Sequence, residues 1–292
     1  MGEVVGAAVL SHVPTIVLPD RERLALNNGK ESTLHSGLYD VRREVFDVLQ
    51  PDLVVVFDSH WFTTVEFVVA AHARRSGRYT SEELPRGMSQ VPYDIPGDPE
   101  FARALAEEAD LVEDCWVTAI DDECLPIHYP TVNLLGFLQG DERWVSVSTA
   151  QTGRTEDFLA VGECVSRAIE RLDRRVFLVG SGALSHTFWP LRELRAHESA
   201  GEEHIFTKEA CAADHEVLDR WSRGEHAAVI DAMPEYLRFR PEGRFGHYLM
   251  TAAAIGGRGC TARGRQYSAY ENAIGTGSAH VVFERPERGW TS

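Results

Sequence analysis

The chain has 292 residues, 43% of them hydrophobic, which is enough material for a buried core. Its formal net charge of −16 at pH 7 argues against binding to nucleic-acid phosphates or anionic membranes, since both need clustered lysine and arginine. The five cysteines form no Cys-x-x-Cys pair, which argues against a zinc finger or a disulfide framework. Because we find neither a signal peptide nor a long apolar run, we expect a cytoplasmic protein with reduced thiols.

The first half of the chain alternates predicted strands with predicted helices. Polar residues over 17–34 are expected to form a loop, and the stretch 72–97, which contains several Gly and Pro residues, is expected to be a long irregular segment. Asp98 followed by Pro99 is typical of a helix start. The predicted strands are 3–10, 53–57, 65–71 and 144–148, and the predicted helices are 35–50, 99–110 and 129–139.

The second half is richer in predicted helix. A loop over 238–243 contains Glu242 and comes just before an apolar helix. The predicted helices are 155–172, 201–222, 225–233 and 246–256, and the predicted strands are 175–180, 264–271 and 279–284. No linker divides the chain. We therefore predict one α/β domain over residues 1–292, with a mostly parallel or mixed central sheet and helices on both faces.

Three of the predicted strands run into a serine followed by a histidine. These pairs are Ser11-His12, Ser59-His60 and Ser185-His186. A single histidine after a strand is usually just a polar loop residue, but the threefold repetition makes coincidence a poor explanation. Ligands of open α/β sheets bind beyond the carboxyl ends of strands. Imidazole is the commonest protein metal ligand and the usual acid/base near neutral pH, so we predict a metal site, a proton-transfer site, or both.

Two histidines and one carboxylate on one face of a metal, with open positions opposite, define the site of non-haem iron(II) oxygenases. His12 and His60 can supply the imidazoles, and Glu242 is the candidate carboxylate because it precedes an apolar helix and can point back to the sheet edge. The alternative for Glu242 is a solvated loop acid or a helix-capping residue.

The motifs also carry a family resemblance over most of the chain. The chain resembles the class III extradiol ring-cleavage dioxygenases, typified by the β subunit of protocatechuate 4,5-dioxygenase, and within them the 3,4-dihydroxyphenylacetate (homoprotocatechuate) 2,3-dioxygenases. The resembling stretches are Leu10-Ser11-His12-Val13-Pro14, Val56-Phe57-Asp58-Ser59-His60-Trp61, Tyr79-Thr80-Ser81-Glu82-Glu83-Leu84-Pro85, Gly180-Ser181-Gly182-Ala183-Leu184-Ser185-His186, Pro234-Glu235-Tyr236, Pro241-Glu242-Gly243 and Gly275-Thr276-Gly277.

The resemblance implies that His12, His60 and Glu242 hold one Fe(2+) and that His186 is the acid/base residue beside the substrate. Many members carry an Asp-His-Gly element whose histidine contacts the substrate. The matching stretch here has His128 followed by Tyr129, so Tyr129 stands where that histidine would be, and both residues are candidate substrate contacts. The implied reaction cleaves a catechol with O2 to a muconic semialdehyde, in a homo-oligomeric enzyme.

Other readings remain open. The chain could cleave an aminophenol or another catechol, or it could be a zinc-dependent hydrolase that uses the same ligands. A non-catalytic interaction protein with the same fold is a further alternative, which the intact site residues disfavour. Manganese(II) in place of iron is also open. Among the remaining histidines, one group is expected at the surface: His72, His197, His204, His215 and His226. His247 is considered for a supporting role beside the site, and His280 for a structural one.

Overall fold

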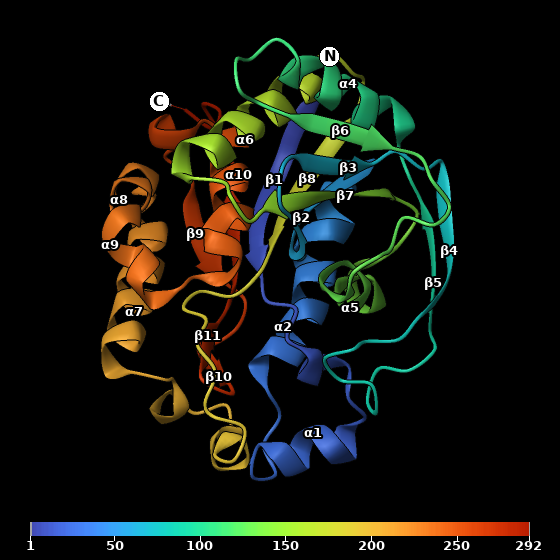
Figure 1. Cartoon of the computed structure of the whole chain (residues 1–292). Coiled ribbons are helices and arrows are strands. Elements are labelled where there is room, and N and C mark those ends of the chain that lie inside the picture. Colours follow the sequence, from blue (N-terminus) through green and yellow to red (C-terminus); the bar gives the residue numbers. More distant parts are fainter. Residues whose placement is uncertain (1, 292) are drawn as a thin grey trace.

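The computed structural model describes residues 2–291 and is built on an eight-stranded mixed sheet (Figure 1). The strand order is β6-β3-β7-β2-β8-β1-β12-β9. The strands are β1 (Glu3–Leu10), β2 (Leu53–Thr63), β3 (Phe67–Ala70), β6 (Val117–Ile120), β7 (Arg143–Ala150), β8 (Arg175–Ser181), β9 (Arg263–Gln266) and β12 (His280–Glu284). Strands β7, β2, β8 and β1 are mutually parallel, whereas β12 and β9 run antiparallel to their neighbours. This confirms the predicted α/β class and the mixed sheet.

Helices cover both faces of the sheet. One face packs against α2 (Thr33–Val41) and α5 (Tyr129–Leu138), and the other packs against α4 (Pro99–Ala109), α6 (Thr155–Glu170) and α10 (Gly246–Ala254). Figure 1 shows a further group of helices along the outer side of β9. That group consists of α7 (Lys208–Arg223), α8 (His226–Asp231) and α9 (Met233–Tyr236).

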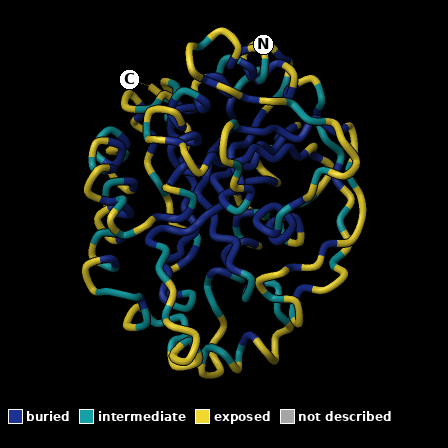
Figure 2. Tube along the Cα trace, in the orientation of Figure 1, coloured by how far each residue is buried: buried dark blue, intermediate teal, exposed yellow. Residues whose placement is uncertain are grey.

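Burial on both faces explains why the central strand β2 has a continuous apolar sequence. Leu53, Val55 and Phe57 pack into the core under α4, α6 and α10, while Val54 and Val56 pack into the core under α2 and α5. All five side chains are fully buried, and Figure 2 shows buried residues concentrated along the central strands. A strand that is covered on both faces needs apolar residues at every position, which is the pattern of buried parallel sheets.

Helices α6 and α10 approach each other at Gly162. A Cβ atom at this position would lie 2.3 Å from the carbonyl oxygen of Met250 and 2.6 Å from the Cβ of Ala253. Only glycine fits this contact without moving a helix. The contact matters for the site described below, because α10 begins directly after the turn that carries Glu242.

The prediction that residues 72–97 form a long irregular segment is wrong. It forms an antiparallel hairpin of β4 (Arg74–Tyr79) and β5 (Val91–Pro96). The glycines and prolines pointed to a loop, but most of them lie in the connection between β4 and β5 or at the end of the hairpin far from that connection. Pro92 and Pro96 are tolerated because a two-stranded ribbon leaves every second backbone N–H outside the ladder.

Several boundaries also differ from the prediction. The expected loop 17–34 contains a polar surface helix, α1 (Asp20–Leu26), whose first turn carries two acidic residues that favour a helix N-terminus. The helix predicted from 201 begins only at Lys208, where the Thr207 hydroxyl accepts a hydrogen bond from the Ala210 N–H.

The strand predicted over 264–271 ends at Gln266, and a short hairpin of β10 (Glu271–Ala273) and β11 (Thr276–Ser278) follows. The helix predicted over 35–50 continues past α2 through a π-helical turn, Arg42–Phe46, into α3 (Asp47–Leu49).

Within residues 2–291, no helix combines the length and the apolar character needed to cross a bilayer.

Candidate metal centre and active site

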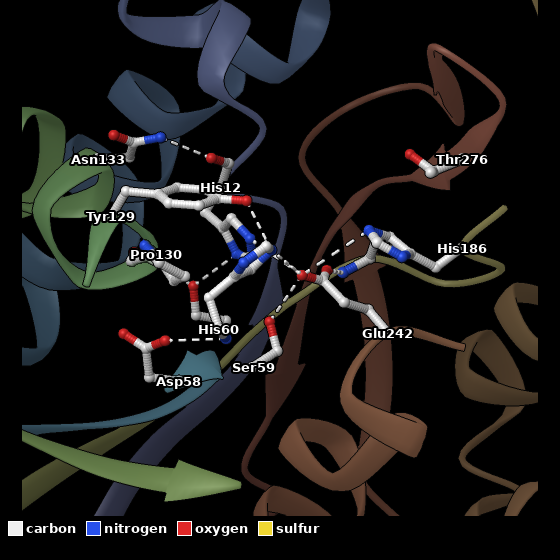
Figure 3. A network of polar contacts seen from close by, with 12 residues as sticks. His12, Asp58, Ser59, His60, Tyr129, Pro130, Asn133, His186, Glu242 and Thr276 are labelled. Atoms are coloured by element: carbon white, nitrogen blue, oxygen red, sulfur yellow. Dashed lines mark hydrogen bonds and ion pairs between the residues drawn. The ribbon is translucent and has the colours of Figure 1, made fainter. Parts of the chain in front are cut away.

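The carboxyl ends of three adjacent parallel strands bring the predicted histidines together (Figure 3). His12 follows β1, His186 lies beyond the end of β8, and His60 lies near the end of β2. The pairing of β2 with β7 shifts register between Asp58 and Phe62, so His60 sits in a bulge. Bulges re-aim side chains, and here the bulge turns the His60 ring towards His12, whose ring centroid is 5.2 Å away.

Glu242 completes the group from the opposite side. Its Oε1 atom lies 2.7 Å from His60 Nε2, 3.3 Å from His12 Nε2 and 4.0 Å from His186 Nε2. One ligand atom from each of His12, His60 and Glu242 lies within 4.8 Å of the others. Figure 3 shows the side chains pointing towards one common point. Two imidazoles and one carboxylate on one side of that point are the donor set of a facial triad.

The hydrogen bonds of His12 prepare it to bind a cation. Its Nδ1 lies 3.0 Å from Ser181 Oγ, and that hydroxyl donates its own proton to the Pro130 carbonyl at 3.2 Å. Ser181 can therefore only accept from His12, which places a proton on Nδ1. In the neutral ring, Nε2 then presents a lone pair to Glu242, and two facing acceptors call for a cation between them. The residues present thus fit a divalent metal ion.

Glu242 is held as an anion in a buried position. Its Oε1 accepts a hydrogen bond from Ser59 Oγ at 2.9 Å, and its Oε2 accepts one from the Ala183 N–H at 2.5 Å. Burial by itself would raise its pKa, but His12, His186 and His60 together hold the pKa of Glu242 well below its usual range. The solvated loop acid considered from the sequence is therefore wrong, because this carboxylate is only 5% exposed.

The backbone around Glu242 is strained. Arg240, Gly243, Arg244 and Phe245 all have positive φ angles, between 52° and 63°. Apart from the glycine, such residues cost free energy and persist only where the surrounding structure imposes them. The result is a sharp turn that directs the Glu242 side chain back to the sheet edge while α10 leads away from it.

Asp58 fixes the orientation of the chain at His60. Its Oδ1 accepts the backbone N–H groups of His60 at 3.1 Å and Trp61 at 3.0 Å, and its Oδ2 accepts the Thr131 hydroxyl at 2.8 Å. The Asp58 side chain is almost fully buried. The carboxylate therefore stabilises the bulge that presents His60.

The group has a closed side and an open side. The side chains of His12 and Glu242 are 4% and 5% exposed, whereas those of His60 and His186 are 25% and 22% exposed. The side that carries His60 and His186, whose ring centroids are 6.5 Å apart, is therefore the side open to solvent. Desolvation lowers the pKa of His186, so a neutral imidazole able to accept a proton faces this opening. Phe188, half exposed, packs edge-on against that ring at 4.6 Å.

The two candidate substrate contacts are separated by the structure. Tyr129 begins α5, and its hydroxyl lies 2.6 Å from His60 Nε2, so it borders the site directly. His128 instead stacks on Trp61 with a centroid separation of 5.9 Å, and its Nε2 has no hydrogen-bond partner within residues 2–291. Burial lowers the pKa of His128.

The sequence did not reveal the groups that support the candidate metal ligands. The serines before the three histidines make different contacts: Ser59 binds Glu242, Ser185 binds the buried Asp214, and the Ser11 hydroxyl has no partner in the described chain. Ser181 and Asp58 were visible only as parts of motifs. The contacts of Ser181 with His12 and Pro130, and of Asp58 with Thr131, join residues more than 45 positions apart, which no local pattern reveals. The bonds of Asp58 to the N–H groups of His60 and Trp61 are local.

The remaining histidines follow the predictions only in part. His280 is structural as predicted, since its ring accepts the Ser11 N–H and contacts the Leu34 carbonyl. His72 and His226 are buried, which corrects their predicted surface position; both rings contact backbone carbonyl oxygens that polarity alone did not reveal. His247 is fully buried five residues after Glu242, and burial lowers its pKa to about 4.

The fold and the donor set together define a class: an α/β protein able to hold a divalent metal at the carboxyl edge of its sheet. Sequence comparison gives the family within that class. Residues 6–283 match the catalytic LigB subunit of aromatic ring-opening dioxygenases, so the chain belongs to this family. It is an enzyme of the extradiol ring-cleavage dioxygenase type, as the resemblance of its motifs implied.

Individual relatives are more distant. The 3,4-dihydroxyphenylacetate 2,3-dioxygenase of Escherichia coli is 28% identical over 243 residues, covering 81% of this chain and 84% of that protein. The 2-aminophenol 1,6-dioxygenase beta subunit of a Pseudomonas species is 25% identical, covering 99% of this chain and 96% of that subunit. The crystal structure of the uncharacterized protein JW3007 from Escherichia coli K12 shares the fold, with a TM-score of 0.61 over 96% of this chain and 99% of that one at 15% identity.

Proposed function

We propose that this enzyme is an iron(II)-dependent 3,4-dihydroxyphenylacetate 2,3-dioxygenase, in which His12, His60 and Glu242 hold the metal. The observation that carries the metal proposal is the Ser181 hydrogen bond, which turns the lone pair of His12 Nε2 towards Glu242. When bound, iron(II) supplies the Lewis acidity and the electron transfer that ring cleavage by O2 requires. The Escherichia coli relative supports the choice of substrate.

The protein residues then divide the remaining work. His186 faces the open side as a neutral base, takes a proton from a catechol hydroxyl through an imidazole nitrogen, and later returns it to an oxygen of the product-forming intermediate. The Tyr129 hydroxyl, next to His60, orients the substrate by hydrogen bonding. His128 supports that wall of the site through its stacking on Trp61.

An oxygen electrode tests this function. The enzyme is reconstituted anaerobically with Fe(II), Mn(II) or Zn(II), mixed with a panel of catechols, and followed by O2 uptake and by the yellow ring-fission product. The proposal expects one O2 consumed per 3,4-dihydroxyphenylacetate with iron. Activity only with zinc, without O2 uptake, would instead establish a hydrolase.

A second candidate substrate is a 2-aminophenol. The relative of that activity covers nearly the whole chain. The panel therefore includes 2-aminophenol. A higher kcat/KM for it than for 3,4-dihydroxyphenylacetate would replace the first candidate.

The proposal extends to the whole molecule. We infer that residues 1–292 act as one catalytic domain, that the enzyme is at least a dimer, and that it works in the cytoplasm. Exposed apolar side chains, among them Val48, Leu111 and Trp116, support assembly, and five cysteines without disulfides support a reducing compartment. A monomer mass by light scattering at micromolar concentration would reject the dimer.

A further inference from the structure

A second buried carboxylate lies behind the active site. Asp214 belongs to α7 and is completely buried. Within residues 2–291 it forms no ion pair with lysine, arginine or histidine. Charged side chains are rarely buried in this way without a partner, so the surroundings of Asp214 require an explanation.

Four donors from three separate parts of the chain surround this carboxylate. Ser185 donates its backbone N–H at 3.1 Å and its hydroxyl at 2.6 Å. The hydroxyl groups of Tyr236 and Tyr270 donate at 2.7 Å and 2.6 Å. The two oxygens of a carboxylate offer about four acceptor positions, so these donors fill its capacity, whereas an amide could accept on one oxygen only.

Ser185 immediately precedes His186, and the surrounding segment also contacts Glu242. The Glu242 N–H donates to the Leu184 carbonyl at 3.2 Å, and the His186 N–H donates to the Phe239 carbonyl at 3.3 Å. The Gly277 N–H donates a hydrogen bond to the Ser185 carbonyl at 2.9 Å. A Cβ at Gly277 would lie 2.1 Å from Asp214 Oδ2, so this glycine allows the close approach. All of these hydrogen bonds join backbone groups. Asp214 differs because it also binds a side chain next to His186, the Ser185 hydroxyl.

We propose that Asp214 is a positioning residue, which holds Ser185 and thereby sets the place of the His186 imidazole relative to the metal-binding group. This inference rests on the proposed acid/base role of His186. A base displaced by about 1 Å can lose on the order of 10²-fold in rate, so a rigid anchor next to His186 has a direct catalytic consequence.

The competing explanation is that Asp214 only stabilises the packing of α7. Tyr236 separates the two explanations, because its hydroxyl binds Asp214 but does not contact Ser185. Tyr236→Phe therefore removes one hydrogen bond from the same buried carboxylate and keeps both contacts to Ser185. It is the matched control for Asp214→Asn, which keeps the volume but withdraws one acceptor oxygen.

The experiment compares both variants as iron-loaded enzymes in steady-state and single-turnover kinetics. Asp214→Asn should keep its iron content and its KM for the catechol within about twofold, while kcat falls by roughly 10- to 100-fold. Tyr236→Phe should keep kcat within about threefold at a similar loss of thermal stability. Equal losses of kcat in the two variants, or a wild-type kcat in Asp214→Asn, would reduce Asp214 to a structural role.

Crystal structures of the variants give a readout that does not depend on turnover. The His186 imidazole should be displaced in Asp214→Asn and unmoved in Tyr236→Phe, even if the wild-type enzyme cleaves no catechol and the proposed function fails. An unmoved His186 in both variants would overturn the inference. If Asp214→Asn does not fold, Ser185→Ala removes the hydroxyl contact alone, and the same shift of His186 with a smaller loss of kcat is expected.

Discussion

The hydroxyl of Ser181 decides which nitrogen of His12 carries the proton. Replacing Ser181 by alanine leaves His12 in place but no longer fixes which of its ring nitrogens carries the proton. We therefore expect metal affinity to fall by roughly 10- to 100-fold. Ser11→Ala is the control, because this serine also precedes a site histidine, yet its hydroxyl has no partner in the described structure. Titration of both apoenzymes with Fe(II) under anaerobic conditions measures the effect. Equal affinities would show that the Ser181 contact does not prepare the ligand.

His186 is expected to behave differently from the three proposed metal ligands, His12, His60 and Glu242. Its Nε2 lies 4.0 Å from Glu242 Oε1, farther than either His12 or His60. His186→Phe should therefore keep its iron and still bind a catechol anaerobically. Its turnover should fall by roughly 10²–10⁴, the usual contribution of a positioned acid/base. Metal analysis and stopped-flow mixing of the anaerobic catechol complex with O2 test this prediction. Loss of iron, or turnover at the wild-type rate, would remove His186 from the acid/base role.

At the scale of elements, Gly162 and Gly136 allow a matched test of packing. Gly162→Ala forces a methyl group into the α6–α10 contact and should destabilise the fold by about 1–3 kcal/mol. Gly136 lies in α5, where a Cβ would meet nothing within 4 Å, so Gly136→Ala should stabilise by about 0.5–1 kcal/mol. Urea unfolding of the two variants measures both signs. A stabilising Gly162→Ala would mean that α10 moves freely, together with the turn that carries Glu242.

The elements also show how far the sequence could predict this molecule. Continuous apolar runs such as Leu53–Phe57 predicted the buried strands, because a strand buried on both faces needs an apolar residue at every position. The hairpin β4–β5 was not predictable in the same way, because β4 has no apolar alternation and the alternation of Val91, Tyr93 and Ile95 in β5 is interrupted by two prolines. His12, His60 and Glu242 were within reach because strand ends and ligand chemistry leave a signal. Ser181 and Asp214 were not, since their roles consist entirely of contacts between distant segments.

At the scale of the whole molecule, buried neutral histidines should make the fold sensitive to acid. Burial lowers the pKa of His280 to about 4 from an ordinary value of 6.5, and its Nδ1 accepts the Ser11 N–H, which a protonated nitrogen could not do. Because the folded state binds the proton less readily, the stabilising effect is complete above pH 6.5 and is lost as the pH falls towards 4. By linkage the loss amounts to about 3 kcal/mol at most.

Urea unfolding between pH 7.5 and 4.5, with a chelator present to remove metal effects, measures this dependence. The free energy of unfolding should decrease below pH 6.5. His280→Gln should be less stable at pH 7.5 but show a shallower decrease below pH 6.5. An unchanged slope in His280→Gln would assign the acid sensitivity to other groups.

The position of β1 in the middle of the sheet has a consequence for synthesis on the ribosome. This strand is translated well before its two neighbours, β8 and β12, which are encoded near residues 175 and 280. At 5–20 residues per second, an apolar strand therefore waits roughly 15 to 55 s for its last neighbour. Throughout that interval the nascent chain exposes an apolar segment that can pair with other chains, so aggregation during synthesis is the expected hazard of this strand order.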